Sequence, residues 1–358
     1  MKKFKNMSKR KKIIFIIITI IIILAIGLSW YKYFNPHYNS VKVKDQKIKI
    51  KRPEYHLKIF DLESSTRPIA VMINNHNQAR PYHSGLQDAK IMYEMIVEGG
   101  ITRMLAVFKD ADLTRIGPVR SARHYYLDYA LENDAIYAHW GWSPQAESDI
   151  KTLGVNNLNG LYDSGFTRDN SLIGKVNLEH TAITSSEGLN KAISSKGYRT
   201  DYNSGDVESE LLLKYSVKEI GIDNEDDSMP ANNVTIPYSS YMTASYTYDS
   251  ENKYYLRYAN GVAHKDYITG EQYHFKNIII VKVRNYTIDS YGRQDLDNIG
   301  TGEGYFITDG YARPITWEKS SRSSKTVYKY ADGSEIKVND GNTFIQIEPS
   351  DMTPSITE

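Results

Sequence analysis

The chain has 358 residues, of which 41% are hydrophobic and 24% charged, a composition that excludes wholesale disorder. Its formal net charge is +1, but residues 1–60 hold 15 of the 44 basic residues and 2 of the 43 acidic ones, so residues 61–358 have a formal net charge of −12. An acidic body argues against a general nucleic-acid binder, and the absence of cysteine excludes disulfides, thiolate catalysis, cysteine-ligated zinc and a lipid-modified cysteine.

The N-terminus predicts a membrane anchor. Residues 1–12 form a basic tail with seven Lys and Arg and no acid, and residues 13–31 are an uncharged run rich in Ile. At about 1.5 Å per residue, a helix of this length covers the ~30 Å hydrocarbon core. The positive-inside rule places the basic tail in the cytoplasm, so we expect a single-pass cell-membrane protein with an extracytoplasmic body. A cleaved signal peptide is the alternative, since Gly27-Leu28-Ser29 weakly resembles a cleavage site.

Residues 32–66 predict a basic stalk. Six Lys and Arg residues fall between Lys42 and Arg52, with Val and Ile among them. Such a segment either adheres to anionic lipid or wall polymer, or serves as a solvated tether. We favour the tether.

Residues 67–200 predict an α/β domain, because strand and helix patterns alternate. The expected strands are 68–73, a hairpin of 93–98 and 101–108 with Gly99-Gly100 as a two-residue turn, and 135–140. Gly117-Pro118 is expected to open a helix that continues to about Glu132, because proline suits the first helical turn. Ser143-Pro144 is expected to start another helix, which Gly154 ends.

The remainder predicts an acidic linker at 201–233, a mainly-β domain at 234–350 and a short tail at 351–358. Glu225-Asp226-Asp227 marks the linker. The expected strands of the mainly-β domain are 245–249, 254–258, 278–283, 304–308, 326–330 and 343–347. The expected turns are Asn260-Gly261, Asp309-Gly310, Asp332-Gly333 and Asp340-Gly341.

Several blocks of sequence carry a family resemblance. They are Arg67-Pro68-Ile69-Ala70-Val71-Met72-Ile73-Asn74-Asn75-His76, residues 93–103, Ile116-Gly117-Pro118-Val119-Arg120-Ser121-Ala122-Arg123, Ser143-Pro144-Gln145-Ala146, residues 289–293 and Trp317-Glu318-Lys319. Together they resemble the YerB-like family over residues 64–348. The resemblance implies a bacterial envelope protein, usually a lipoprotein, with two domains of unassigned function. This chain has no Cys to lipidate, so the membrane helix would replace the lipid. The family has no agreed catalytic residues.

The predicted hairpin fixes the relation between two carboxylates. With a two-residue turn, Glu98 would pair with Ile101, and Arg103 would share a face with Glu94 and Glu98. Arg103 would then lie diagonal to Glu98, within reach of an ion pair. Glu94 and Glu98 would be roughly 13 Å apart, whereas glycosidase carboxyls are about 5–9.5 Å apart. On a strand they therefore cannot form a glycosidase pair. Glu94 and Glu98 remain the candidate catalytic residues, either of which could act as an acid or base, and an ordinary surface ion pair is the alternative.

Two arginines are expected at the start of the helix that Gly117-Pro118 opens. Arg120 and Arg123 are spaced i, i+3, on neighbouring surface. Because a helix N-terminus carries partial positive charge, two Arg there require a negative partner. That partner is either an anionic ligand or a protein carboxylate such as Glu94 or Glu98.

Two polar loops follow predicted strands. Asn74, Asn75 and His76 follow the first, and His139 and Trp140 end a later one. Ligands of α/β sheets gather at the carboxyl ends of strands, so these loops could line one cleft with Arg120 and Arg123. Asn, Arg and Trp suit sugar rings that bear carboxylates or amides, as in peptidoglycan. Interior packing is the alternative for His139 and Trp140.

The sequence favours binding over catalysis. No HExxH, Gly-x-Ser-x-Gly or P-loop pattern occurs, and His76, His83 and His139 have no recognised metal-site spacing, so we expect no metal and no cofactor. The favoured function is a membrane-anchored binding or scaffold protein that recognises peptidoglycan, an anionic glycan or a wall-synthesis partner. The alternative is a wall-degrading hydrolase or lyase, in which Glu94 or Glu98 acts as acid or base.

Overall fold

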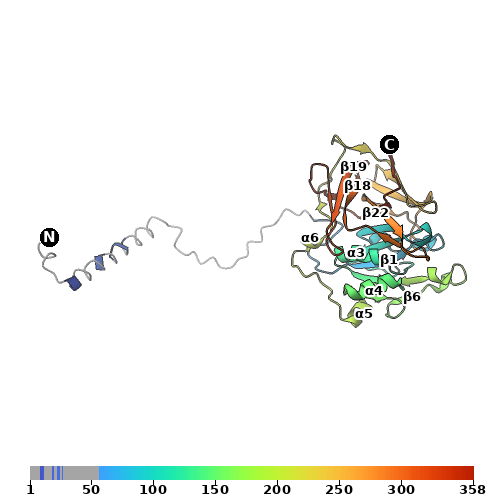
Figure 1. Ribbon diagram of the computed structural model, residues 1–358, viewed down its shortest axis with the longest axis horizontal. Helices are drawn as coiled ribbons and strands as arrows, with labels where there is room; N and C mark the ends of the chain where they lie inside the picture. Colours follow the sequence, from blue (N-terminus) through green and yellow to red (C-terminus); the bar gives the residue numbers. More distant parts are fainter. Residues whose placement is uncertain (1–8, 12–17, 20–21, 25, 27–55) are drawn as a thin grey trace. The chain divides into compact units, whose positions relative to one another are not determined.

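The structure is a computed structural model, and it describes residues 9–11, 18–19, 22–24, 26 and 56–358 (Figure 1). The described residues before position 27 are α-helical. No helix within these described ranges is both long and apolar enough to cross a membrane. Most of the predicted membrane helix, and the predicted stalk up to residue 55, lie outside the described residues. The chain divides into two units, Met1–Glu54 and Tyr55–Glu358.

The unit from Tyr55 onward is built on a large sheet, which contains 11 strands within residues 56–358. The strand order is β20-β19-β18-β15-β22-β2-β3-β1-β4-β5, with β9 beside β19. The strands are β1 (Ile69–Asn74), β2 (Ile91–Ile96), β3 (Thr102–Phe108), β4 (Ile136–His139), β5 (Asn157–Asn159), β9 (Met229–Pro230), β15 (Asn277–Val283), β18 (Gly300–Thr308), β19 (Tyr311–Lys319), β20 (Val327–Lys329) and β22 (Thr343–Pro349). The regions predicted as domains 67–200 and 234–350 therefore share one sheet.

Strand β22 joins the two regions. It pairs in parallel with β2 on one side and with β15 on the other. Every residue of β22 and β2 is buried. Strands buried on both faces are normally apolar along their whole length. The polar residues Glu94 and Gln346, which face each other across β2 and β22, therefore need partners inside the protein.

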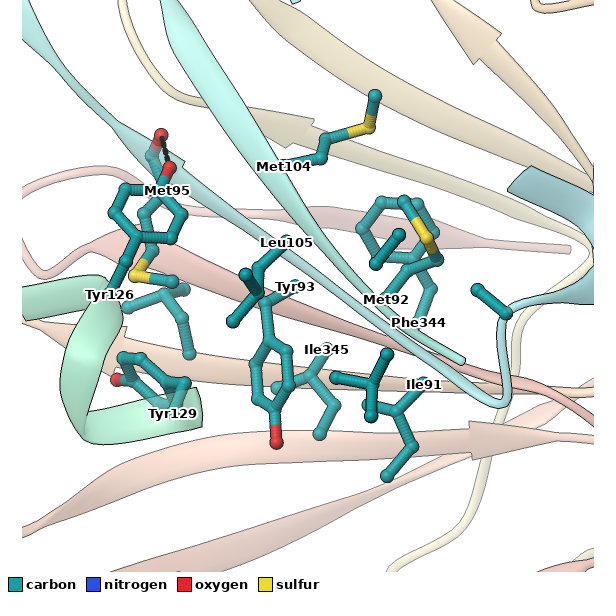
Figure 2. Close-up of a cluster of buried hydrophobic side chains, with 14 of the residues drawn as sticks. Ile91, Met92, Tyr93, Met95, Met104, Leu105, Tyr126, Tyr129, Phe344 and Ile345 are labelled. Carbon is teal, nitrogen blue, oxygen red and sulfur yellow. Dashed lines mark hydrogen bonds between the residues drawn. The ribbon is translucent and has the colours of Figure 1, made fainter. Parts of the chain in front are cut away.

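Helix α3 (His124–Glu132) covers one face of these central strands (Figure 2). The rings of Tyr93 and Tyr129 lie 4.9 Å apart, and the Tyr126 hydroxyl donates to the Met95 carbonyl at 2.9 Å. These contacts fix the helix on the sheet through aromatic packing and a side-chain-to-backbone hydrogen bond.

A second sheet covers the opposite face. Its order is β13-β12-β11-β10-β23, with β14 beside β12. Its strands are β10 (Asn233–Pro237), β11 (Thr243–Asp249), β12 (Tyr254–Ala259), β13 (Val262–Ala263), β14 (His274–Phe275) and β23 (Ser355–Thr357). The ring of Phe344 on β22 lies 6.1 Å from that of Tyr246 and 4.8 Å from that of Phe275. The core between the two sheets therefore combines side chains from β22 of the large sheet and from β11 and β14 of the second sheet.

The remaining elements are short. The other helices are α4 (Pro144–Thr152), α5 (Ser186–Lys196) and α6 (Val207–Glu210), and the 3-10 turns are η2 (Arg80–Tyr82), η3 (Leu86–Asp88), η4 (Glu98–Gly100), η5 (Asn170–Leu172) and η6 (Leu178–His180). Small ladders pair β6 (Phe166–Arg168) with β7 (Ala182–Thr184), β8 (Tyr215–Ser216) with β21 (Val338–Asn339) and β16 (Asn285–Thr287) with β17 (Gln294–Leu296). Residues 211–358, all of them described, contain no helix. The prediction of a mainly-β second half is confirmed.

Several local predictions are confirmed. The buried strands expected at 68–73 and 135–140 are β1 and β4. Ser143 caps α4 by accepting a hydrogen bond from the Ala146 N–H. The predicted acidic linker and tail, by contrast, each contribute a strand that the sequence did not predict, since β9 pairs with β19 and β23 pairs with β10.

The predicted hairpin register was wrong by one residue. The Val97 N–H donates to the Ile101 carbonyl at 2.8 Å, so three residues, Glu98–Gly100, form the turn. Glu94 consequently pairs with Met104, and Arg103 pairs with Met95. A slip of one residue moves side chains to the opposite face. Glu94 and Arg103 therefore point to different sides of the sheet.

The predicted helix at 117–132 begins seven residues later, at His124. Residues 116–122 are extended and form isolated bridges with Thr184, Ser84, Ile73 and Trp142. Proline is compatible with a helix start, but these bridges satisfy backbone groups from several neighbouring segments. Arg120 and Arg123 therefore do not lie in the first turn of a helix; Arg123 is the extended residue that precedes it.

Candidate functional site

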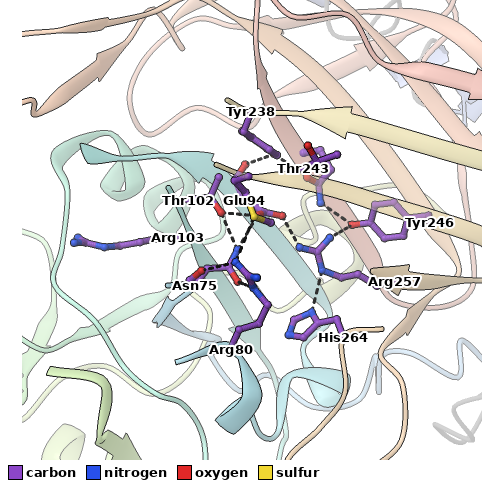
Figure 3. A network of polar contacts seen from close by, with 12 residues as sticks. Asn75, Arg80, Glu94, Thr102, Arg103, Tyr238, Thr243, Tyr246, Arg257 and His264 are labelled. Carbon is purple, nitrogen blue, oxygen red and sulfur yellow. Dashed lines mark hydrogen bonds and ion pairs between the residues drawn. The ribbon is translucent and has the colours of Figure 1, made fainter. Parts of the chain in front are cut away.

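Glu94 lies at the centre of a buried polar network (Figure 3). Its side chain has 0% exposure, as does that of Arg257, whose Nη2 lies 2.8 Å from Glu94 Oε2. Asn75 Nδ2 and the Thr102 hydroxyl donate to Oε1 at 2.8 and 2.6 Å. With its oxygens occupied and shielded from solvent, Glu94 has no surface to offer a substrate. This placement favours a structural role for a residue predicted as a catalytic candidate.

The network crosses from the first region to the second. Arg257 on β12 also donates to the Tyr246 hydroxyl at 3.0 Å and to His264 Nδ1 at 3.1 Å. The Tyr238 hydroxyl lies 2.9 Å from the Glu94 carbonyl and 2.7 Å from Gln346 Oε1. Two of these contacts cross between the regions: the Glu94–Arg257 ion pair and the hydrogen bond from Tyr238 to the Glu94 carbonyl. We call this buried network, with its supporting hydrogen bonds, the seam, and it holds the two regions together.

A pair of histidines extends the seam. His83 Nδ1 and His264 Nε2 are 2.7 Å apart, and His83 Nε2 contacts the Asn74 carbonyl at 2.6 Å. Burial lowers the pKa of His83 to about 3 and lowers the pKa of His264 well below its usual value. Both imidazoles are therefore neutral in the folded protein at neutral pH.

A second polar group lies where two parallel strands separate. β1 and β4 pair through only three residues, Ile69 to Val71. Beyond them the Arg120 N–H donates to the Met72 carbonyl at 2.9 Å, and the Trp140 N–H donates to the Arg120 carbonyl at 3.0 Å. The backbone of Arg120 thus lies between the two strands at their carboxyl ends. In open α/β sheets, such a separation is where ligands bind.

The Arg120 side chain is half-buried and unpaired. Among the described residues its guanidinium makes no hydrogen bond and no ion pair. Burial is the main influence that lowers its pKa; the charge of Glu179 opposes this, and Arg123 adds to the lowering. A guanidinium that has lost part of its hydration without gaining a partner is suited to an external anion.

Glu98 binds the neighbouring arginines instead. Arg123 Nε and Nη2 lie 2.6 and 2.8 Å from the two Glu98 oxygens, a bidentate pair, and Arg103 Nη2 lies 3.8 Å from Oε2. Burial acts to raise the pKa of Glu98, but the Arg123 hydrogen bonds and the charges of Arg123 and Arg103 outweigh it, so the pKa is lowered. Burial lowers the pKa of Arg103 to about 9.

Two stacked histidines border Arg120. The rings of His76 and His180 lie 4.6 Å apart and nearly parallel, and Asn74 Nδ2 contacts His180 Nδ1 at 2.8 Å. Burial lowers the pKa of both rings, to about 4 for His180, and the positive charge of Arg120 acts in the same direction. The neutral imidazoles therefore supply uncharged hydrogen-bonding groups near the guanidinium, while the buried Asn74 amide, bonded to His180 and to the His76 N–H, positions them.

Trp140 and His139 have different environments. The Arg168 guanidinium lies over the Trp140 ring, 4.7 Å from its centre, and the half-buried Trp140 also contacts Phe166. His139 has 0% exposure, and its nitrogens contact the Gly141 carbonyl and Asn157 Oδ1. Burial lowers the pKa of His139 to about 4. His139 therefore lies in the interior with hydrogen-bond partners for both nitrogens, which is the position that the packing alternative described.

The predicted site residues thus separate into two groups. Asn74, His76, Arg120 and Trp140 belong to the carboxyl end of β1 and β4, and Glu98 with Arg103 and Arg123 adjoins it. Asn75 points to the other side of the sheet, where it binds Glu94. Glu94, Asn75 and His139 therefore lie apart from the group around Arg120, and ligand binding by that group stays a prediction.

Sequence reasoning missed His180, Glu179 and Arg168 in this cluster, and Arg257, Tyr238 and His264 in the seam. These residues have no distinctive spacing, and some are far from their partners in sequence; Arg257 follows Glu94 by 163 positions. Only the meeting of distant strands reveals them.

Comparisons with known proteins cover most of the chain. The N-terminal domain of DUF3048, a protein of unknown function, matches residues 59–199, and the DUF3048 C-terminal domain matches residues 234–345. The chain is 32% identical over 325 residues to "Putative lipoprotein YerB" of Bacillus subtilis (strain 168), a match that covers 88% of this chain and 91% of that protein. The crystal structure of the YerB protein from Bacillus subtilis is similar with a TM-score of 0.70 and 31% identity, over 82% of this chain and 94% of that one.

Breaking the seam ion pair should be costly. Glu94→Gln or Arg257→Met leaves one charged or polar partner buried, so we expect each to lower the free energy of unfolding by about 3–5 kcal/mol. The double variant should lose clearly less than the two single losses combined, because no charge is left alone. Chemical denaturation of the four proteins gives the cycle. The control is Arg284→Met, which breaks the Arg284–Asp297 pair, whose side chains are 70% and 48% exposed. It should change the free energy of unfolding by less than about 0.5 kcal/mol. If the two single losses simply added up in the double variant, the proposed coupling between Glu94 and Arg257 would be contradicted.

Acid should weaken the fold through the neutral histidines. An unfolded histidine takes up a proton below about pH 6.5, whereas folded His83 does so only at about pH 3. The contribution of His83 is therefore complete above pH 6.5 and is lost as the pH falls from 6.5 toward 3. The free energy of unfolding should drop by about 1.4 kcal/mol per pH unit for this group. Urea unfolding between pH 7.5 and 5 measures the slope, which His83→Gln should reduce by about one proton; an unchanged slope in the variant would exclude the assignment.

Proposed function

This chain belongs to the DUF3048 family, that of YerB, as its sequence blocks predicted, and we propose that it is an anchored extracytoplasmic protein of the bacterial envelope that binds wall material bearing carboxylate groups. The family itself has no assigned biochemical function. The proposal therefore rests on the site and on the N-terminal sequence.

The Arg120 guanidinium, which has no hydrogen-bond or ion-pair partner among the described residues, carries the proposal. It lies at the carboxyl end of the sheet near the stacked imidazoles of His76 and His180. A carboxylate would satisfy the guanidinium, and the imidazole nitrogens that are not already bonded to Asn74 or Gln78 would bind hydroxyl or amide groups next to it. Peptidoglycan, with sugar rings, amides and carboxylates, offers this combination.

Binding is better supported than hydrolysis. A general acid at neutral pH needs a raised pKa, but the Arg123 and Arg103 interactions lower the pKa of Glu98. The other candidate acid, Glu94, is enclosed by its partners. The wall-degrading alternative therefore lacks a carboxyl that is both accessible and suitably protonated among the predicted candidates.

The anchoring part of the proposal has two supports. Residues 13–31 are long and apolar enough in sequence to span a bilayer, with basic residues before them. The similar Bacillus subtilis protein is named as a putative lipoprotein, and a lipid and a membrane helix are alternative ways to hold a body outside the membrane.

Peptidoglycan binding should depend on Arg120. We expect the purified chain to sediment with insoluble peptidoglycan without releasing soluble fragments, and Arg120→Gln to weaken this binding about 10-fold through loss of one charge-assisted contact. Arg284→Gln, at an exposed arginine of the second region, is the matched control and should bind like the unaltered chain. Fragment release, or equal binding by Arg120→Gln, would refute the proposed site.

The anchor predicts an orientation. Protease added to intact cells whose wall has been removed should degrade the body, leaving the N-terminal tail protected in the cytoplasm. A cytoplasmic protein followed in the same sample should survive until lysis. A body that survives as long as this control would contradict the extracytoplasmic assignment.

A further inference from the structure

A groove lies between the two regions of the fold, apart from the Arg120 site. It has a volume of about 390 Å³ and is walled by η2 of the first region and by the 259–265 segment of the second. Pro81, Ala259, Val262 and Ala263 give it apolar sides. The volume is within the range of small-molecule sites, which commonly form between parts of a fold with apolar walls and a few polar groups.

Two basic side chains border this groove. Arg80 uses Nε and Nη2 to donate to Asn75 Oδ1 and the Asn75 carbonyl, at 3.0 and 2.9 Å. Its Nη1 has no protein partner in the described part of the chain and retains contact with solvent. The side chain of Lys265, also at the groove, is exposed and makes no hydrogen bond or ion pair with described residues.

The acid at the groove does not balance these cations. Asp266 Oδ2 accepts from the Gly85 N–H and the Tyr273 hydroxyl, both at 2.8 Å. Its Oδ1 accepts from the Ile268 and Thr269 N–H groups at 2.8 and 3.1 Å. These four hydrogen bonds satisfy the Asp266 carboxylate. It forms no ion pair with Arg80 or Lys265.

His264 gives the groove a neutral inner wall. It is 3% exposed and already bonded to Arg257 and His83. The Arg80 guanidinium is half-buried and has lost part of its hydration, and this burial lowers its pKa. Apolar walls, one free guanidinium N–H and a nearby free ammonium together suit a molecule with an apolar body and a single anionic end.

We propose that this groove is a second binding site, for a small carboxylic acid whose apolar body lies against Pro81, Ala259 and Val262 and whose carboxylate meets Arg80 and Lys265. A carboxylate is favoured over a phosphate because Arg80 already uses two of its nitrogens on Asn75, so Nη1 of Arg80 and the Lys265 ammonium suit two carboxylate oxygens better than three phosphate oxygens. Since Arg80 also holds Asn75, which binds Glu94, an occupant would brace the seam between the regions.

Equilibrium dialysis of the full chain in lipid nanodiscs tests the proposal, with benzoate as the probe and empty nanodiscs subtracted. Benzoate should bind saturably, and benzylamine, of similar size but opposite charge, should not. Val262→Glu should weaken benzoate binding about 10-fold, because it places an acid at the groove without disturbing the core; Val262 is 70% exposed. Val217→Glu, at a partly exposed valine away from the groove, is the matched control and should have no effect.

Further variants separate this site from others. Arg80→Gln and Lys265→Gln should each reduce benzoate binding several-fold; Lys265→Gln keeps the inference testable if loss of Arg80 impairs folding. Arg120→Gln should leave benzoate binding unchanged. Equal binding of benzylamine, or benzoate binding that is indifferent to Val262→Glu and Lys265→Gln, would overturn the groove site. Loss of benzoate binding in Arg120→Gln alone would also overturn it, by placing benzoate at the other site.

Discussion

The buried ion pair between Glu94 and Arg257 is the constraint on which the rest of the fold depends. Both side chains have 0% exposure, so neither can recover its hydration except through protein partners. Asn75 and Thr102 on one side and Tyr246 on the other meet this need. Each partner comes from a different strand or loop, and the requirement fixes the second sheet on the first. The two regions are consequently halves of one cooperative core.

The same reasoning distinguishes structural charges from functional ones. Glu98 and Arg123 form a bidentate pair, and Asp266 is bound by four donors, so these charges are satisfied within the protein. Among the residues that the structure describes, half-buried Arg120 has no hydrogen-bond or ion-pair partner, and Nη1 of Arg80 makes no hydrogen bond. Partial desolvation without compensation is unfavourable for folding, and a ligand that supplies the missing acceptor removes the penalty.

The direction of the strands decides where the Arg120 cluster forms. β4 and β5 run parallel to β1, and β15 and β22 run parallel to β2, so their carboxyl ends lie at one edge of the sheet. β3 is antiparallel to both β1 and β2, which aligns the two sets. The segment 119–122 then enters between β1 and β4 and carries Arg120 to this edge. The site is therefore a consequence of sheet topology.

The sequence by itself determined the local features: the buried strands β1 and β4, the start of α4 at Ser143, and the mainly-β character of the second half. These depend on hydrophobic periodicity and turn residues within a few positions of one another. It also predicted that the loops holding Asn74, Asn75, His76, His139 and Trp140 could line one cleft with Arg120 and Arg123, because ligands of α/β sheets gather at the carboxyl ends of strands. That cleft stays a prediction. The N-terminal span stays a prediction from sequence, since most of it lies outside the described residues.

Tertiary structure alone decided the rest. One extra residue in the turn at Glu98–Gly100 reversed the faces of Glu94 and Arg103, and pairing with distant segments kept residues 116–122 extended. Arg120 and Arg123 are both arginines and lie three positions apart, yet Glu98 binds Arg123, whereas Arg120 has no hydrogen bond or ion pair within the described part of the chain. Such differences arise from desolvation and contacts across the fold, which act between residues that the linear sequence keeps far apart.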